Sequence, residues 1–290
     1  AVAGTARTRL GYTTGKWNEI DGQIEYEGLS VIGQDHFNSF TNGETEYPVV
    51  ADATSNELNQ GWIRYSGLPK TQLKLGRQRI LLDNQRFIGN VGWRQTEMTY
   101  DAALLTSSLI PRTTFTYANL TNVNSFRFFG FDTNPDPLVT SLRNDNDVDI
   151  KGHLVNAAIA VIPKKLSVTA YAYLLDFDEL PVGAAARLFQ DTKTIGLRAS
   201  GAVPVSSFTL SYALEYADQQ DYEDAPSTVD AAYTLIEAGL AKGKFKGTLG
   251  HETLDLGAHG GRMLDLLGHD ARAEPLRVRL DRLAGHDVPQ

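Results

Sequence analysis

The 290-residue chain contains no cysteine, so no disulfide, thiolate metal site or cysteine nucleophile can contribute to it. It also lacks any apolar run close to the roughly 20 residues that a membrane-spanning helix needs. No Gly-x-Ser-x-Gly, His-Glu-x-x-His or P-loop string occurs. The formal net charge is -8, whereas nucleic-acid binding needs a basic face. We therefore expect no helical membrane protein, no enzyme, no cofactor, no metal site and no nucleic-acid partner.

What the chain does have is alternation of side chains with period two, in segments of about ten residues. In segment 208–216 one face carries phenylalanine, leucine and tyrosine, and the other carries Thr209, Ser211, Ala213 and Glu215. Successive side chains of a strand point to opposite faces, so this segment predicts a strand with one apolar and one polar face. Helical periodicity is rare.

Twelve segments alternate in this way, some less cleanly than others. They are 6–13, 23–32, 57–66, 71–79, 95–104, 113–118, 153–162, 166–177, 192–201, 208–216, 231–240 and 244–253. Short connections such as 67–70 and 163–165 are separated by long polar ones such as 33–56 and 121–149. Short turns at one end and long loops at the other are typical of outer-membrane barrels. The sequence therefore predicts an all-β fold, an antiparallel up-and-down transmembrane β-barrel with about 12 strands visible.

Tyrosine and tryptophan lie mostly near the ends of the predicted strands. The examples are Tyr12, Trp17, Tyr65, Trp93, Tyr100, Tyr117, Tyr173 and Tyr216. This placement is typical of the aromatic girdles at membrane interfaces. The alternative is plain strand propensity, because aromatic residues favour any sheet.

The composition changes near residue 255. All 27 aromatic residues lie at or before Phe245, and four of the six histidines lie after position 250. We therefore expect a β-barrel pore domain at 1–255 and an atypical C-terminal tail at 256–290 that is not barrel-like. Two interpretations of the tail remain open. It is either an amphipathic helix or disordered tail, or the product of a frameshift, because 268–282 read one base downstream can encode aromatic residues.

Several motifs in a fixed order resemble one protein family. They are R-T-R-L-G-Y-T-T-G-K-W at 7–17, Y-P-V-V-A-D at 47–52, L-K-L-G-R-Q-R-I at 73–80, D-N-Q-R-F at 83–87, G-N-V-G-W-R-Q at 89–95 and A-Y-A-Y-L-L-D-F at 170–177. Over residues 5–253 the set resembles the alginate-export-domain porins of Gram-negative bacteria. Compared with that family, the chain is expected to lack the N-terminal start with its signal peptide, and to lack an aromatic closing strand.

The resemblance implies a bacterial outer-membrane barrel that passes solutes and that has about 14 to 18 strands in an intact family member. The implied function is a porin for small hydrophilic solutes, including anions or sugar acids, and the best-known branch of the family exports alginate. The alternative is a non-conducting structural or adhesive barrel with partner-binding loops. The expected partners are outer-membrane lipid and lipopolysaccharide, and small hydrophilic solutes or acidic saccharides.

Charged side chains in the polar phase of the strands are the candidate pore-lining residues, because an Arg or Lys on the lipid face costs about 2–4 kcal/mol near the midplane. These candidates are Arg7, Arg9, Glu25, Glu27, Arg64, Lys74, Glu97, Asp101, Arg198 and Glu215. The arginines can form a ladder for carboxylates, or they can pair with neighbouring carboxylates and fill the interior.

In one arginine-rich segment, the alternation of the strand would place charged side chains on the lipid face. Arg77 and Arg79 continue the phase of Leu73 and Leu75, so either the strand has left the hydrocarbon there or Gly76 marks a bulge that switches the face. The pore-lining candidates in and around the following connection are Arg77, Arg79, Arg86 and Arg94. We expect this segment to fold toward the pore as a constriction.

Overall fold

The computed structural model describes residues 2–39, 42–50, 54–124, 147–178, 191–225, 229–256 and 277–282, which form one antiparallel sheet of 13 strands. The strands are β1 (Val2–Thr13), β2 (Ile20–His36), β3 (Ser55–Leu68), β4 (Thr71–Gln78), β5 (Thr99–Ser107), β6 (Thr113–Asn124), β7 (Asp147–Ile162), β8 (Leu166–Phe177), β9 (Thr192–Val205), β10 (Phe208–Asp221), β11 (Asp230–Lys242), β12 (Phe245–Leu256) and β13 (Arg277–Arg282). Among these residues no helix has the length and hydrophobicity that crossing a membrane requires.

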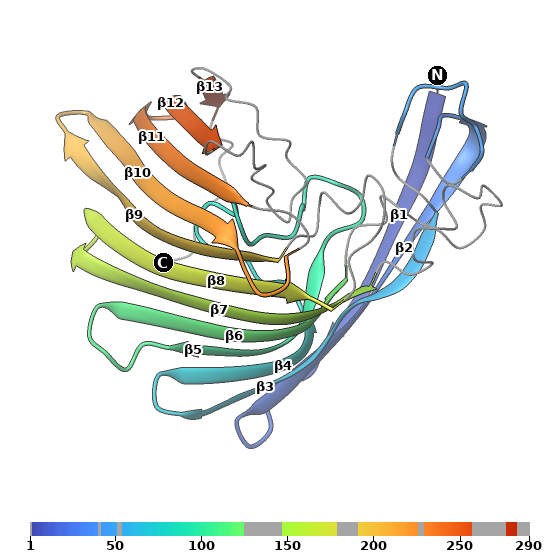
Figure 1. Ribbon diagram of the computed structural model, residues 1–290, viewed down its shortest axis with the longest axis horizontal. Coiled ribbons are helices and arrows are strands. Elements are labelled where there is room, and N and C mark those ends of the chain that lie inside the picture. Colours follow the sequence, from blue (N-terminus) through green and yellow to red (C-terminus); the bar gives the residue numbers. More distant parts are fainter. Residues whose placement is uncertain are drawn as a thin grey trace.

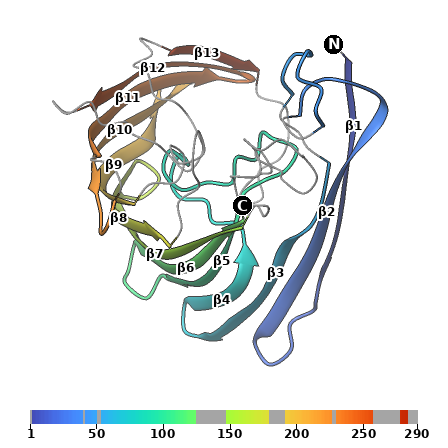
Figure 2. The ribbon, with the colours of Figure 1, turned by 45° about the vertical axis from the view of Figure 1, so that its right-hand side comes forward.

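Each strand pairs with its neighbours in sequence, so the hydrogen-bonded order runs from β1 to β13 without a crossover. The sheet is strongly curved, and the connection between β4 and β5 runs inside the curve (Figures 1 and 2). The twelve predicted segments coincide with β1 to β12. The prediction of an all-β, antiparallel up-and-down barrel is therefore confirmed.

The connections are of two kinds, as the sequence predicted. Short turns join β3 to β4, β7 to β8, β9 to β10 and β11 to β12 at one end of the sheet, here called the turn end. Several turns contain a residue with positive φ, including Lys70 (49°), Lys164 (63°) and Ser206 (55°). The tightest hairpin turns require such backbone angles because their twist then matches that of the strands. The longer connections lie at the opposite end, here called the loop end.

Strand β10 shows how the alternation separates the two faces of the sheet. Ala213 and Glu215 are buried inside the curve, whereas Leu214 and Tyr216 are 51% and 55% exposed on the outside. The other strands continue this apolar outer face. It includes Leu10, Ile24, Ile63, Leu75, Ile159, Ile195, Leu197, Ile236, Leu240 and Leu249. The concave side is called the inner face and the convex side the outer face.

The residues considered for an aromatic girdle divide between the two faces. Tyr12, Tyr65 and Tyr216 are widely exposed on the outer face. Tyr100 and Tyr173 instead point inward and are almost fully buried. Proximity to a strand end therefore did not distinguish outward from inward aromatic residues, because it ignores the phase of the strand.

Part of the tail beyond residue 255 is described. Arg277–Arg282 forms β13 and pairs antiparallel with residues 245–250 of β12. Residues 257–276 and 283–290 lie outside the described residues, as does most of the predicted loop 121–149. The division at residue 255 therefore stays a prediction. The short strand β13 shows that part of the tail pairs with the sheet.

An arginine placed on the outer face tests whether that face contacts lipid. We expect Leu214→Arg to destabilise the inserted barrel by about 2–4 kcal/mol, because a charge near the bilayer midplane must leave water. Thr209→Arg is the control, since Thr209 lies in the inner phase of the same strand. Urea unfolding in lipid vesicles measures both variants. Equal losses would show that the outer face is not the lipid face.

Candidate functional site

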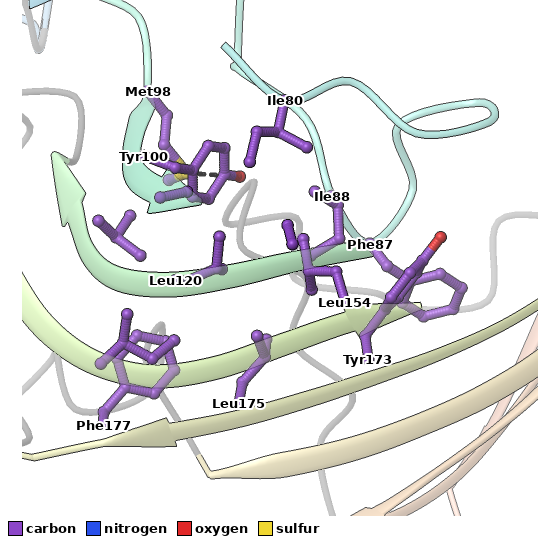
Figure 3. Packing of buried hydrophobic residues seen from close by; sticks show 14 of the residues in the cluster. Ile80, Phe87, Ile88, Met98, Tyr100, Leu120, Leu154, Tyr173, Leu175 and Phe177 are labelled. Atoms are coloured by element: carbon purple, nitrogen blue, oxygen red, sulfur yellow. Dashed lines mark hydrogen bonds between the residues drawn. The ribbon is translucent and has the colours of Figure 1, made fainter. Parts of the chain in front are cut away.

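The connection between β4 and β5, residues 79–98, is here called the inner loop. Several of its apolar side chains are buried, including Ile80, Phe87, Ile88 and Met98. They join one hydrophobic cluster with inner-face residues such as Leu154 (Figure 3). Burying this apolar surface favours folding the loop into the curve rather than leaving it in solvent.

Asparagine side chains and residues with a left-handed backbone conformation shape the inner loop. Asp83, Gln85 and Val91 have positive φ values of 50°, 61° and 52°. The side-chain oxygen of Asn90 accepts a hydrogen bond from the Gly92 amide at 3.1 Å. Asn84 accepts one from the Arg86 amide in the same way, also at 3.1 Å. Such asparagine turns stabilise irregular backbone, so the loop has a defined path.

Both ends of the inner loop, at Arg79 and at Glu97, are anchored by a group of charged and amide side chains, here called the Glu97 cluster. Its members are Arg7, Arg9, Glu25, Glu27, Asn59, Arg79, Asn90 and Glu97. Glu97 accepts hydrogen bonds from Arg9 at 2.7 Å and from Arg79 at 2.7 Å. Asn59 and Asn90 each donate to it at 2.6 Å.

The remaining ion pairs of the Glu97 cluster lie along β1 and β2. Arg79 also bonds Glu25 at 2.8 Å, and Arg7 bonds Glu27 at 3.0 Å. Arg9 pairs with both Glu27 and Glu97. The cluster therefore links the inner loop to three strands on one side of the sheet.

Glu97 lies outside the strands and is only 2% exposed. Burial opposes its ionisation, but hydrogen bonds from Arg79 and Asn59 outweigh this effect. Together with the charges of Arg79 and Arg9 they hold the pKa of Glu97 below its ordinary value of 4.5. The ionised form is thus the one that the cluster stabilises.

Acid should weaken this anchor. Because the folded-state pKa is lowered, the stabilisation by Glu97 is complete above its unfolded value of about 4.5 and is lost as the pH falls through the folded value. We expect the protection factors of the inner-loop amides, which correct for the pH dependence of intrinsic exchange, to fall as the pH drops below about 4.5. Glu97→Gln should remove this acid step. The same step in that variant would assign it to another carboxylate.

Residues 83–87 of the inner loop reach the opposite wall, formed by β7, β8, β10, β11 and β12. The Phe87 ring lies 5.9 Å from the Tyr171 ring and 5.6 Å from the Tyr233 ring, between centroids. The Arg86 guanidinium lies 5.0 Å from the centroid of the Tyr233 ring and 3.4 Å from Glu252. The inner loop therefore spans the space between the two walls.

Polar contacts strengthen this second attachment. Asn84 donates to Glu215 at 3.2 Å, and Asn156 of β7 donates to Asp83 at 2.7 Å. Glu215 also accepts a hydrogen bond from Tyr171 at 2.8 Å. The two contacts that involve the inner loop, Asn84 with Glu215 and Asn156 with Asp83, join residues more than 70 positions apart in the chain.

The remaining predicted residues lie in smaller groups. Arg198 pairs with Glu215 on the inner face. Arg64 donates from Nε to Asp21 at 2.9 Å, and Lys74 lies over the Trp62 ring. In the inner loop, the Arg94 guanidinium is 4.6 Å from the centroid of the Trp93 ring. Inner-face arginines are thus paired with carboxylates rather than arranged as an unpaired ladder.

Two predicted residues are placed differently from expectation. Arg77 and Asp101 bond each other at 2.8 Å and lie in the outer phase of β4 and β5. Gly76 has φ 113°, but its pairing with β3 and β5 is regular, so the face does not switch there. Both residues lie near the loop end of their strands. A charge on the outer face costs little there, because the penalty falls toward the membrane interface.

Arg79 reaches the inner side for another reason. Strand β4 ends at Gln78, and the chain then turns into the inner loop. Alternation holds only within a strand, so the phase of Leu75 does not extend to Arg79. The change of face comes from the end of the strand rather than from a bulge.

Sequence reasoning missed several residues of the site. They are Asp21, Asn59, Trp62, Asp83, Asn84, Phe87, Asn90, Asn156, Tyr171, Tyr173, Tyr233 and Glu252. Glu252 could have been found from the alternation of β12. Leu249 and His251 belong to the outer phase, so Glu252 belongs to the inner phase. The loop residues carried no signal, because their partners are distant in sequence.

The family model described as alginate export matches residues 29–240, which is most of the chain. The chain belongs to the alginate export family. Members of this family are channels of the Gram-negative outer membrane rather than enzymes, so this chain is an outer-membrane protein and the prediction against an enzyme agrees with its family. A search of curated proteins found no match.

Solved structures with the same fold come from Pseudomonas aeruginosa and Acinetobacter baumannii. OpdK of P. aeruginosa, in its crystal structure with vanillate, has a TM-score of 0.61 at 10% identity, over 86% of this chain and 61% of that one. OpdL of P. aeruginosa gives 0.60 at 18% identity, over 96% and 70%. OccAB2 of A. baumannii gives 0.61 at 15% identity, over 89% and 63%. The alginate export chain thus spans about three fifths of OpdK.

Proposed function

We propose that this alginate export family protein is a porin that passes small hydrophilic solutes, with anions and sugar acids as the preferred class. The observation that carries the proposal is the inner loop, which is attached to both walls and so narrows the space inside the curve. A loop fixed in this way acts as a constriction. Family membership supports the same function.

The charges around the inner loop indicate how such a constriction would select solutes. Arginines and carboxylates occur side by side in the Glu97 cluster, and a second mixed group surrounds Glu215. A passage lined by both signs screens solutes by size and by a transverse field rather than by one tight binding pocket. Small charged or polar solutes therefore fit better than large apolar ones.

Two further points support organic anions as the solute class. The crystal structure of the similar protein OpdK contains vanillate, which is an organic carboxylate. In this chain the inner face carries several guanidinium groups, which bind carboxylates well. Acidic saccharides belong to the same chemical class. Outer-membrane lipid and lipopolysaccharide are the proposed surroundings of the outer face.

Single-channel recording in planar bilayers tests this proposal. Refolded protein should give stepwise conductance, and the reversal potential across a KCl gradient should show whether anions or cations pass preferentially. The chain unfolded in denaturant before addition is the control. Insertion without any conductance steps would contradict the porin proposal and would favour the structural or adhesive barrel.

A further inference from the structure

One lysine on the inner face is held by a tryptophan instead of a carboxylate. The Lys74 Nζ lies 4.5 Å from the centroid of the Trp62 ring. The two residues are diagonal neighbours on adjacent strands, because Arg64 pairs with Lys74 and Trp62 pairs with Gly76. Trp62 is 9% exposed, so its ring forms a fixed surface beneath the ammonium group.

A second cation contacts the same tryptophan. The guanidinium carbon of Arg64 lies 5.4 Å from the Trp62 centroid. Arg64 also donates to both carboxylate oxygens of Asp21, from Nε at 2.9 Å and from Nη2. The Asp21 carboxylate is thus already bound by Arg64.

The charged groups that act on Lys74 are two arginines, Arg64 and Arg79, and one aspartate, Asp21. Asp21 is paired with Arg64, and Arg79 is paired within the Glu97 cluster. Among the residues that the structure describes, no carboxylate forms an ion pair with Lys74 itself.

A half-buried ammonium group that lies over an indole ring gains from a mobile anion. The ammonium has three N–H donors, and an indole face replaces a full ion pair only partly. An anion beside it would accept a charge-assisted hydrogen bond. A carboxylate suits this position, because the neighbouring Arg64 already binds one.

We propose that Lys74, supported by Trp62, binds the carboxylate of a small organic acid on the turn-end side of the Glu97 cluster. This inference rests on the proposed porin function, since the acid would reach Lys74 from the lumen. It makes Lys74, rather than the paired arginines, the residue that distinguishes an acid from a neutral solute of the same size.

The fluorescence emission of Trp62 can report binding at Lys74. The chain has three tryptophans, at positions 17, 62 and 93, so a Trp17→Phe, Trp93→Phe variant reports Trp62 alone. Refolded protein is titrated with sodium glucuronate and, separately, with glucose at constant ionic strength. Glucuronate should change the Trp62 emission in a saturable way, and glucose should not.

Variants of Lys74 and of a matched lysine test the assignment in this background. Lys74→Gln should weaken glucuronate binding about tenfold or more, because it removes a charged hydrogen-bond donor. Lys74→Arg should retain binding, which also shows that the site tolerates substitution. Lys246→Gln is the control, since Lys246 lies in the inner phase of β12 on the opposite wall. It should bind glucuronate as the parent does.

The outcomes separate this inference from the porin proposal. An equal response to glucose, or unchanged binding in Lys74→Gln, would overturn the Lys74 site. Stepwise conductance without saturable glucuronate binding would leave the porin proposal standing and remove the site. Saturable binding lost in Lys74→Gln, in a protein that gives no conductance, would retain the site and remove the porin.

Discussion

A Glu97→Ala channel will carry a larger current per channel than the unchanged protein, because its inner loop loses an anchor. Glu97 accepts hydrogen bonds from Arg9, Arg79, Asn59 and Asn90. Removing one partner of a buried ion pair costs about 3–5 kcal/mol, since the remaining charges are left without compensation. We expect the lower end of that range, because the two arginines are partly exposed to water.

Conductance in planar bilayers and urea unfolding in vesicles measure the two consequences of Glu97→Ala. Glu19→Ala is the matched control, because Glu19 lies in a turn and forms an exposed pair with Lys16 at 3.3 Å. Exposed pairs contribute about 0–1 kcal/mol, so this variant should differ little from the parent. Parental conductance and stability in Glu97→Ala would refute the anchoring role of the Glu97 cluster.

The second large effect is expected from Phe87→Ala at the other attachment. The Phe87 ring is buried against Tyr171 and Tyr233, and removing a buried phenylalanine costs about 3–5 kcal/mol. This loss should fall on the docking of the inner loop rather than on the strands, which keep their own hydrogen bonds. Amide exchange should therefore accelerate across residues 79–98 while strand amides stay protected.

Trp93→Ala controls for the loss of an aromatic ring from the same loop. Trp93 is 69% exposed, so its replacement should change stability by no more than about 0.5 kcal/mol. Single-channel conductance should rise in Phe87→Ala and stay near the parental value in Trp93→Ala. Equal exchange rates in the two variants would contradict docking through Phe87.

The barrel wall was predictable from local pattern. Segments such as 208–216 alternate strictly, and a strand allows only two side-chain directions, so each pattern already separates two faces. Turn residues such as Lys70 lie where the pattern is interrupted. The connection after β4 was expected to fold inward, and the inner loop lies inside the curve (Figure 1), where apolar side chains such as Phe87 and Ile88 are buried.

The assignment of a face to lipid or to the interior failed where the interior is apolar. Asp101 was expected to line the pore, which would place its neighbours Tyr100 and Ala102 in the lipid phase of their segment. They instead pack in the cluster formed with the inner loop. Asp101, between them, consequently lies outside and pairs with Arg77.

By itself, the sequence determined the strands, their alternating faces, the two kinds of connection and the family resemblance, because each depends on neighbours a few residues apart. Only the tertiary structure decided which face of β5 is inner, where the inner loop attaches and which charges pair. Those outcomes depend on contacts such as Asn84 with Glu215, across more than 100 positions of chain. Local alternation carries no information about partners that far apart.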